Sequence, residues 1–133
     1  MAILVDTVAW VTLLEGRILG TRSRGKTLFY IPGGKREPGE GDLDTLLREV
    51  KEELGVNLRG GTAVHVGTFD APADGYGSDA VVRMACYTAD HDGDPTPQGE
   101  IAEMEWLSYA DRPRVAPVDQ VLFDQLHATG DLG

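Results

Sequence analysis

Three glutamates stand within five residues of the segment "REVKEELGV" (48–56): Glu49, Glu52 and Glu53. On a helix, Glu49 and Glu53 lie one turn apart on one flank, where like charges repel. The nearby helix C-terminus disfavours anions further. A divalent cation would remove this conflict, because Mg²⁺ takes oxygen ligands and bridges carboxylates to phosphates. The alternative is a solvated acidic face in which Arg48 pairs with Glu52.

A helix from 42 to 54 must position these glutamates. Its apolar residues fall on one narrow stripe at about 100° per residue: Leu43, Leu46, Leu47, Val50 and Leu54. Asp42 is the expected N-cap and Gly55 the expected left-handed stop. In this geometry Glu49 and Glu53 occupy an exposed flank beside the stripe, and Glu52 lies opposite it.

The rest of the chain is dominated by short apolar and β-branched runs, which predict strands. The predicted strands cover 5–14, 17–22, 27–31, 62–70, 79–89 and a segment that ends near 107. Gly33 and Gly34 follow Pro32 and predict a tight turn. Loops are expected at 71–78 and 90–99, and a C-terminal helix has Pro117 in its first turn. This order predicts an α/β fold with a mixed β-sheet between helices.

Composition limits the function further. The chain has 133 residues and a net charge of −10, which predicts one domain over 1–133 and disfavours binding of a nucleic-acid polymer. Cys86 is the only cysteine and lies in an apolar run, so we expect a buried thiol and a reducing compartment. The N-terminus lacks a signal-peptide pattern, and no apolar run is long enough to span a bilayer. We therefore expect a cytoplasmic protein without membrane contact.

The helix and the glycines before it belong to a longer motif. Gly34, Glu40 and the run from Arg48 to Val56 fit the pattern G-x5-E-x7-R-E-U-x-E-E-x-G-U, in which U is aliphatic. This segment, 34–56, resembles the complete Nudix box of the Nudix hydrolases. The segment "FYIPGGK" before it, the strands on both sides and the C-terminal helix extend the resemblance over most of the chain. The chain looks most similar to the small MutT-like subgroup.

The resemblance implies a Nudix-type α/β/α sandwich and hydrolysis of a nucleoside diphosphate linked to another moiety, X. Water attacks a diphosphate phosphorus with the help of Mg²⁺, or Mn²⁺ as a substitute. By the same resemblance, Glu49, Glu52 and Glu53 would be metal ligands, and one of them could polarise the water. A carbonyl of Gly33 or Gly34 would add a ligand.

Within the box, the resemblance gives Glu40 and Arg48 a structural role, as a pair that holds the loop on the helix. Outside the box, two further acidic residues are candidates. Some relatives use a later glutamate as a metal ligand or base, and Glu100 is the candidate here, with Glu103 and Glu105 as competitors and a solvated loop charge as the alternative. Purine-specific relatives read the base with a polar residue at the start of the last helix, the place that Asp119 occupies. The alternative for Asp119 is a first-turn residue favoured by the helix dipole.

Cations and one aromatic residue complete the candidate substrate contacts. Arg22 and Arg24 flank the expected mouth of the site and could bind phosphates, or could be plain surface charges. Lys35 could meet a phosphate as a point charge. Tyr30 could stack on a base or simply pack.

The short chain and Asp119 favour a (deoxy)nucleoside triphosphate, including an oxidised purine, that is cut to a monophosphate and pyrophosphate. The alternatives are an ADP-ribose or dinucleotide pyrophosphatase of the same fold, and a Nudix module that senses a nucleotide without cutting it. A purely structural acidic domain would leave the crowded glutamates without a purpose. The expected partner is a small nucleotide, and the expected assembly is a monomer or a homodimer.

Overall fold

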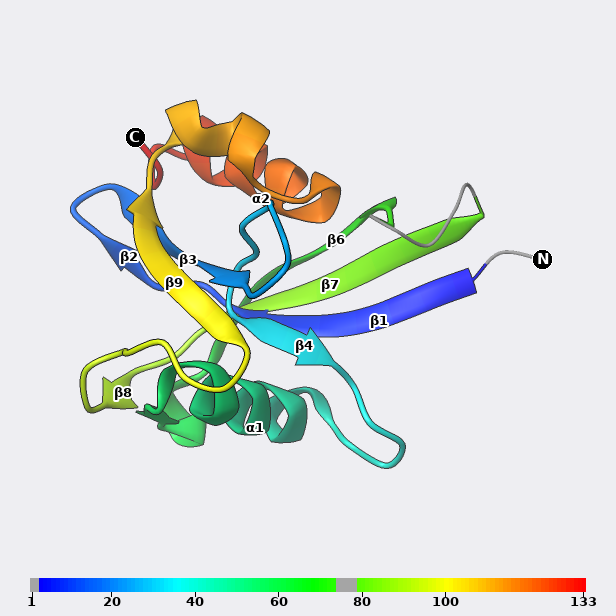
Figure 1. Cartoon of the computed structure of the whole chain (residues 1–133), viewed down its shortest axis with the longest axis vertical. Helices are drawn as coiled ribbons and strands as arrows, with labels where there is room; N and C mark the ends of the chain where they lie inside the picture. Colours follow the sequence, from blue (N-terminus) through cyan, green and yellow to red (C-terminus); the bar gives the residue numbers. More distant parts are fainter. Residues whose placement is uncertain (1–2, 74–78) are drawn as a thin grey trace.

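The computed structural model describes residues 3–73 and 79–133. Its central element is a mixed four-stranded sheet flanked by two helices. The strands lie in the order β4 (Gly33–Lys35), β1 (Ile3–Trp10), β7 (Ala80–Thr88) and β6 (Val64–Pro72). β1 and β7 are parallel, and the other two pairs are antiparallel. Helices α1 (Asp42–Leu54) and α2 (Pro117–Ala128) lie on opposite sides of this sheet (Figure 1).

Two smaller sheets complete the fold. β2 (Leu13–Leu14), β3 (Arg17–Ser23) and β9 (Ile101–Leu107) form an antiparallel sheet, and β5 (Asn57–Leu58) pairs with β8 (His91–Asp92). Short 3₁₀ helices cover Gly60–Thr62 and Tyr109–Arg114. No helix among the described residues combines the length and the apolar content that a membrane-spanning segment requires. The sequence prediction of an α/β fold with a mixed sheet between helices is therefore confirmed.

The end of β1 shows how the sheet divides the core in two. Side chains of successive strand residues point to opposite faces. Val8 and Trp10 join the cluster under α1, whereas Ala9 and Val11 join the cluster under α2. A strand that is covered on both faces needs apolar side chains at every position, as this run has.

Helix α1 has the predicted bounds, with two differences in detail. The N-cap is Gly41 and not Asp42, whose carboxylate instead binds Arg36 and Tyr87. Gly55 ends the helix in the left-handed conformation with φ 72°, as predicted. Leu46, Val50 and Leu54 are buried, but Leu43 at the helix start remains 37% exposed.

The segment around the two glycines was predicted wrongly. Residues 27–31 form no named strand, only isolated bridges at Phe29 and Tyr30. The predicted turn at 33–34 is instead strand β4, antiparallel to β1. A Cβ on Gly33, at φ 150°, would lie 2.0 Å from the carbonyl oxygen of Val8, so this pairing requires glycine.

The remaining differences concern strand ends and loops. The predicted strand 5–14 is divided into β1 and β2, and the predicted loop 90–99 contains β8. β6 extends into the predicted loop 71–78, of which residues 74–78 lie outside the described residues. The predicted strands 62–70 and 79–89 correspond to β6 and β7, each with small shifts of its ends.

Candidate active site

Glu49 and Glu53 reach from α1 to the backbone of β4. The N–H of Gly33 donates a hydrogen bond of 2.9 Å to Glu53 Oε1. A Cβ on Gly34 would lie 2.4 Å from the carboxyl carbon of Glu49. Both glycines are therefore needed for close approach, one to β1 and the other to a carboxylate. The i, i+4 spacing on the helix places the two carboxylates on the flank that faces β4.

The glutamates differ in their exposure. Glu53 is partly buried and lines a cavity, which corrects the expectation of an exposed flank, whereas Glu52 remains 60% exposed. Burial, together with the charges of Glu49, Glu52 and Glu100, raises the pKa of Glu53 to about 8, although the hydrogen bond from Gly33 opposes this shift. Burial also raises the pKa of Glu49, although Arg48 opposes this shift. The positive groups and hydrogen bonds around Glu49 and Glu53 therefore do not fully compensate the cost of ionising these two carboxyl groups.

Arg48 joins the helix to the loop before it. Its guanidinium donates to both carboxylate oxygens of Glu40 at 2.8 Å, to Glu49 Oε1 at 2.7 Å and to the Lys35 carbonyl at 3.3 Å. The hydrogen bonds from Arg48, with smaller contributions from other donors, lower the pKa of Glu40 to about 2. Glu40 also accepts hydrogen bonds from the Thr45 hydroxyl and the Glu37 N–H. The pair therefore holds the loop 36–41 on α1.

A divalent cation fits the donor atoms at this place. Carboxylate and carbonyl oxygens are the ligands that Mg²⁺ prefers. Burial first, and neighbouring carboxylates second, raise the pKa of Glu49 and Glu53, and a bound cation would offset both costs of ionising them. Within 3–73 and 79–133 no group of three or more His, Cys, Asp or Glu side chains is already arranged around a common point. Arg48 donates to Oε1 of Glu49 and the Gly33 amide to Oε1 of Glu53, so the second oxygen of each carboxylate could bind a cation while these hydrogen bonds persist.

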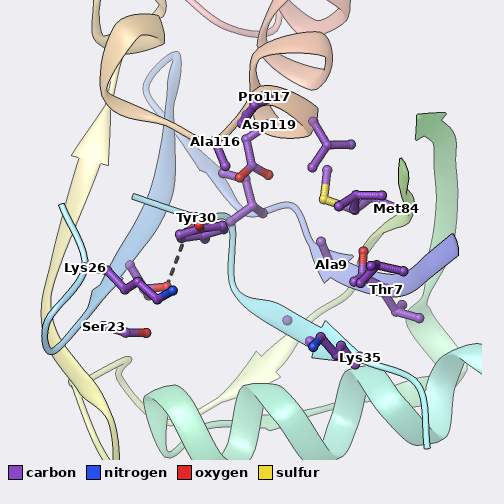
Figure 2. Close-up of a pocket in the computed structure, with 18 of the residues that line it drawn as sticks. Thr7, Ala9, Ser23, Lys26, Tyr30, Lys35, Met84, Ala116, Pro117 and Asp119 are labelled. Atoms are coloured by element: carbon purple, nitrogen blue, oxygen red, sulfur yellow. Dashed lines mark hydrogen bonds between the residues drawn. The ribbon is translucent and has the colours of Figure 1, made fainter. Parts of the chain in front are cut away.

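A cavity of about 290 Å³ opens beside Glu53, between β1, β3, β4, β7 and the start of α2 (Figure 2). Its apolar wall contains Val5, Ile31, Pro72, Val82 and Met84. Its polar lining contains Thr7, Thr21, Ser23, Lys26, Tyr30, Lys35, Glu53 and Asp119. Apolar walls with a few polar groups are typical of sites for small molecules. The structure thus brings the predicted residues Tyr30, Gly33, Gly34, Lys35, Glu53 and Asp119 to one cavity.

Asp119 is the unusual group of this cavity. Its side chain is 1% exposed, and neither carboxyl oxygen has a hydrogen-bond partner among the described residues. Burial raises the pKa of Asp119 to about 8, and the nearby backbone N–H of Ile31 offsets only part of this shift. A buried polar group without a partner is costly, and a ligand is one way to satisfy it. Asp119 lies in the first turn of α2, as the alternative interpretation of the sequence expected, but the helix dipole does not explain why its carboxyl group is buried without a partner among the described residues.

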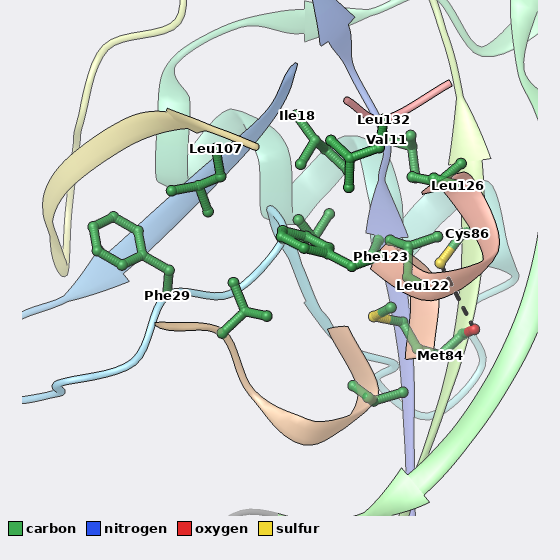
Figure 3. Packing of buried hydrophobic residues seen from close by; sticks show 14 of the residues in the cluster. Val11, Ile18, Phe29, Met84, Cys86, Leu107, Leu122, Phe123, Leu126 and Leu132 are labelled. Atoms are coloured by element: carbon green, nitrogen blue, oxygen red, sulfur yellow. Dashed lines mark hydrogen bonds between the residues drawn. The ribbon is translucent and has the colours of Figure 1, made fainter. Parts of the chain in front are cut away.

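Packing of α2 holds Asp119 over the cavity. Leu122, Phe123 and Leu126 are buried in one cluster with Cys86 and Leu107 (Figure 3). Pro117 begins the helix at a position where its missing N–H costs no hydrogen bond. The expectation of a buried thiol at Cys86 is confirmed, and burial raises its pKa. A well-packed helix fixes the direction of its first turn, so Asp119 is directed by the core and not by its own contacts.

The two predicted arginines do not line the cavity. Arg22 forms an ion pair of 2.6 Å with Glu103, and its guanidinium donates to the Lys26 carbonyl at 3.0 Å. Arg24 donates to the Gly99 carbonyl at 2.6 Å. Both arginines therefore stabilise loops near the site and do not face it.

Glu100 lies close enough to Glu53 to raise the pKa of that residue, although it does not line the cavity. Its competitors are engaged elsewhere, because Glu103 pairs with Arg22 and Glu105 with Arg114 at 2.6 Å. No ion pair of Glu100 is found among the described residues. Of the three glutamates, Glu100 is thus the one that remains available to the site.

Sequence reasoning missed Ser23 and Lys26, which also line the cavity. Both belong to the turn that follows β3, in the segment "SRGK". Gly25 in this segment has φ 80°, and the Lys26 N–H donates to the Ser23 carbonyl at 3.1 Å. The sequence "SRGK" indicated a loop here, but it gave no information on which side chains point into the cavity.

The sequence of the chain is similar to a known domain family and to a known protein. A sequence model of the NUDIX domain matches residues 4–126. The MutT4 protein of Mycobacterium tuberculosis (strain CDC 1551 / Oshkosh) is 32% identical over 140 aligned positions, covering 92% of this chain and 52% of that protein, so the chain spans about half of its length.

Solved structures show the same fold. The E. coli ORF135 protein has a TM-score of 0.75 at 24% identity, covering 96% of this chain and 91% of that one. The MutT NUDIX hydrolase from Burkholderia pseudomallei has a TM-score of 0.76 at 21% identity, with coverage of 92% and 98%. The chain therefore belongs to the NUDIX domain family and is similar to MutT proteins in sequence and in fold.

Proposed function

We propose that the chain is a metal-dependent pyrophosphohydrolase that cuts a (deoxy)nucleoside triphosphate to a monophosphate and pyrophosphate. One observation carries this proposal: a single cavity has the unpartnered carboxyl group of Asp119 on one side and the glutamate-bearing flank of α1 on the other. A nucleotide has the matching polarity, with a hydrogen-bonding base at one end and an anionic chain at the other.

The base would lie between the apolar wall and Asp119. A carboxyl group with a pKa near 8 holds its proton at neutral pH, so it offers one donor and one acceptor. A purine edge, including that of an oxidised purine, offers the complementary pair of groups. Tyr30 lines the same part of the cavity and can contact the base with its ring.

The phosphates would lie against β4 and α1. Glu49, Glu52 and Glu53, with a carbonyl of Gly33 or Gly34, would hold a divalent cation, for which we propose Mg²⁺ with Mn²⁺ as a substitute. The cation, when bound, neutralises the phosphoryl oxygens during attack by water. The chain itself supplies orientation, because Arg48 and Glu40 fix the loop against α1 and the Gly33 amide positions Glu53. Lys35 lines the cavity beside these groups and adds a positive charge for the phosphates.

Glu100 is proposed as a further metal ligand or base. Two sets of contacts support this proposal, because they hold the loop that carries Glu100 near α1 and near the turn after β3. The loop before it caps α1, because the N–H groups of Thr96 and Gln98 donate to the carbonyls of Leu54 and Glu53 at 3.0 and 2.9 Å. Arg24 then joins this loop to the turn after β3. Free carbonyls at a helix end need such partners, so the cap and the placement of Glu100 have the same cause.

The remaining proposals concern the protein as a whole. We propose one Nudix domain over 1–133, with a small nucleotide as partner and a monomer or homodimer as assembly. The matched range 4–126 and the packing of α2 on the sheet support the single domain. A cytoplasmic location is supported by the single cysteine, which is buried and forms no disulfide.

A product assay tests the proposed function. The protein is incubated with Mg²⁺ and a panel of normal and oxidised nucleoside triphosphates, ADP-ribose and dinucleoside polyphosphates. We expect a monophosphate and pyrophosphate from one triphosphate. Turnover of ADP-ribose or a dinucleotide alone would replace the substrate class, and binding without turnover would favour a nucleotide sensor.

The variant Glu53→Gln serves as the critical control. Its amide oxygen can still accept the Gly33 N–H, so the fold should persist, while turnover should fall by about 10²-fold or more, the range for one lost electrostatic contact to a transition state. Glu15→Gln, in the exposed β2–β3 turn, removes the same charge away from the cavity and should retain activity. Full activity in Glu53→Gln would contradict the proposed role of this glutamate.

A further inference from the structure

The turn after β3 presents a positive charge to the cavity that the sequence motif does not include. We infer that Lys26 binds a phosphate group of the substrate, in the place that sequence reasoning gave to Arg22 and Arg24. This inference rests on the proposed function, because it assigns a further contact in the same cavity. It adds a binding residue that lies outside the segment 34–56.

Two arginines hold the turn after β3 in place. The Arg22 guanidinium donates to the carbonyls of Ser23 and Lys26 at 3.5 and 3.0 Å, while its other side pairs with Glu103 on β9. Arg24 is fixed on the Gly99 carbonyl, and its own N–H donates to the Glu100 carbonyl at 2.8 Å. Both arginines are thus used to hold the turn in place. The left-handed conformation of Gly25 then directs the next residue, Lys26, toward the cavity.

The Lys26 side chain lines the cavity with its charge not neutralised by a carboxylate of the described residues. Its backbone is bonded in the turn, but no carboxylate among the described residues forms an ion pair with its side chain. The chain carries a net charge of −10, so an acidic partner would be easy to provide on this surface. An extended lysine beside a cavity without such a partner is suited to an anion that arrives from solution.

Lys26 lies at the end of the cavity away from Asp119. Figure 2 shows Asp119 above the ring of Tyr30, whereas Lys26 and Lys35 lie below it, on opposite sides of the cavity. The two lysines are therefore on the side away from the proposed base site. A phosphate chain that leaves the base past Tyr30 enters the space between these two cations. Lysine binds phosphate as a point charge and does not require a fixed geometry.

Binding of magnesium tripolyphosphate, measured by titration calorimetry, tests this inference. Tripolyphosphate has no base, so the result does not depend on which nucleotide is the substrate. We expect Lys26→Gln to bind about tenfold more weakly than the wild type, the size of one charge-assisted hydrogen bond. Lys26→Arg keeps the charge and should stay within about threefold of the wild type.

Arg17→Gln is the matched control for net charge. Arg17 is exposed at the start of β3 and does not line the cavity, so this variant loses the same positive charge elsewhere. Equal loss of affinity in Arg17→Gln and Lys26→Gln would overturn the inference, because long-range charge would then explain it. No binding of tripolyphosphate by the wild type would overturn it as well. Failure of the proposed function would give a different result. The wild type would bind tripolyphosphate and Lys26→Gln would bind it more weakly, but no nucleotide would be hydrolysed in the product assay.

Discussion

Asp119 is the residue whose ionisation should be visible in the stability of the whole protein. In an unfolded chain its pKa is near the ordinary value of 3.8, and in the folded protein burial raises it to about 8. Between these two values the folded state binds more protons than the unfolded state, so stability falls as pH rises. Below the unfolded pKa both states are protonated and the penalty disappears.

We expect Asp119→Asn to remove this pH dependence. The difference in melting temperature between the variant and the wild type should grow in favour of the variant from about pH 5 to about pH 9. Thermal melts across this range measure it. Asp94→Asn, at an exposed loop position, should show no such growth. A constant difference between Asp119→Asn and the wild type at every pH would show that this carboxyl group is already ionised in the folded protein.

At the scale of elements, among the contacts between α1 and the loop 36–41, Arg48 makes the largest set of hydrogen bonds from a single side chain. Arg48→Ala removes hydrogen bonds to Glu40, Glu49 and the Lys35 carbonyl. We expect the melting temperature to fall by roughly 5 °C, the effect of losing one to two kcal/mol in a chain of this size. Arg59→Ala breaks only an ion pair with Asp92 in which both side chains are 57% exposed, and should change the melt little. An unchanged melt with lost activity in Arg48→Ala would make Arg48 catalytic instead of structural.

The same elements show what the sequence could predict. Helix α1 was found with its bounds because its apolar stripe and Gly55 are local signals. Strand β4 was missed because its pairing depends on Val8, far away in the sequence, and two glycines indicate a turn more often than a strand. Strand β8 was missed for the same reason, since it is two residues long and exists through its pairing with β5.

The candidate site divides in a similar way. Glu49, Glu52 and Glu53 belong to one local motif, so sequence pattern was enough to group them. The directions of Arg22, Arg24 and Lys26 depend on contacts with Glu103 and Gly99, which come from β9 and the loop before it. Spacing along the chain carries no information on such contacts. For this reason the sequence prediction named Arg22 and Arg24 at this turn, whereas Ser23 and Lys26 are the residues of the turn that line the cavity.

At the scale of the molecule, the net charge of −10 raises the question of how a site for a polyphosphate can exist. In the described residues, two lysines and the backbone of β4 lie beside the cavity, and the cation that we propose would bind to the glutamates of α1. Self-repulsion of this acidic chain should make it sensitive to any cation. Specific binding of Mg²⁺ must therefore be separated from general screening.

We expect Mg²⁺ to raise the melting temperature, because a ligand that binds only the folded state stabilises it by RT ln(1 + [L]/Kd), about 2.7 kcal/mol at a concentration of 100 Kd. Glu49 and Glu53 contribute most of this effect, since burial raises the pKa of both and a cation relieves their repulsion. Melts with MgCl₂ are compared with melts in NaCl of equal ionic strength, for the wild type and Glu53→Gln. The increase should exceed that of NaCl in the wild type and shrink in the variant. Equal increases for both salts, or for both proteins, would show that Mg²⁺ acts only by screening the acidic surface.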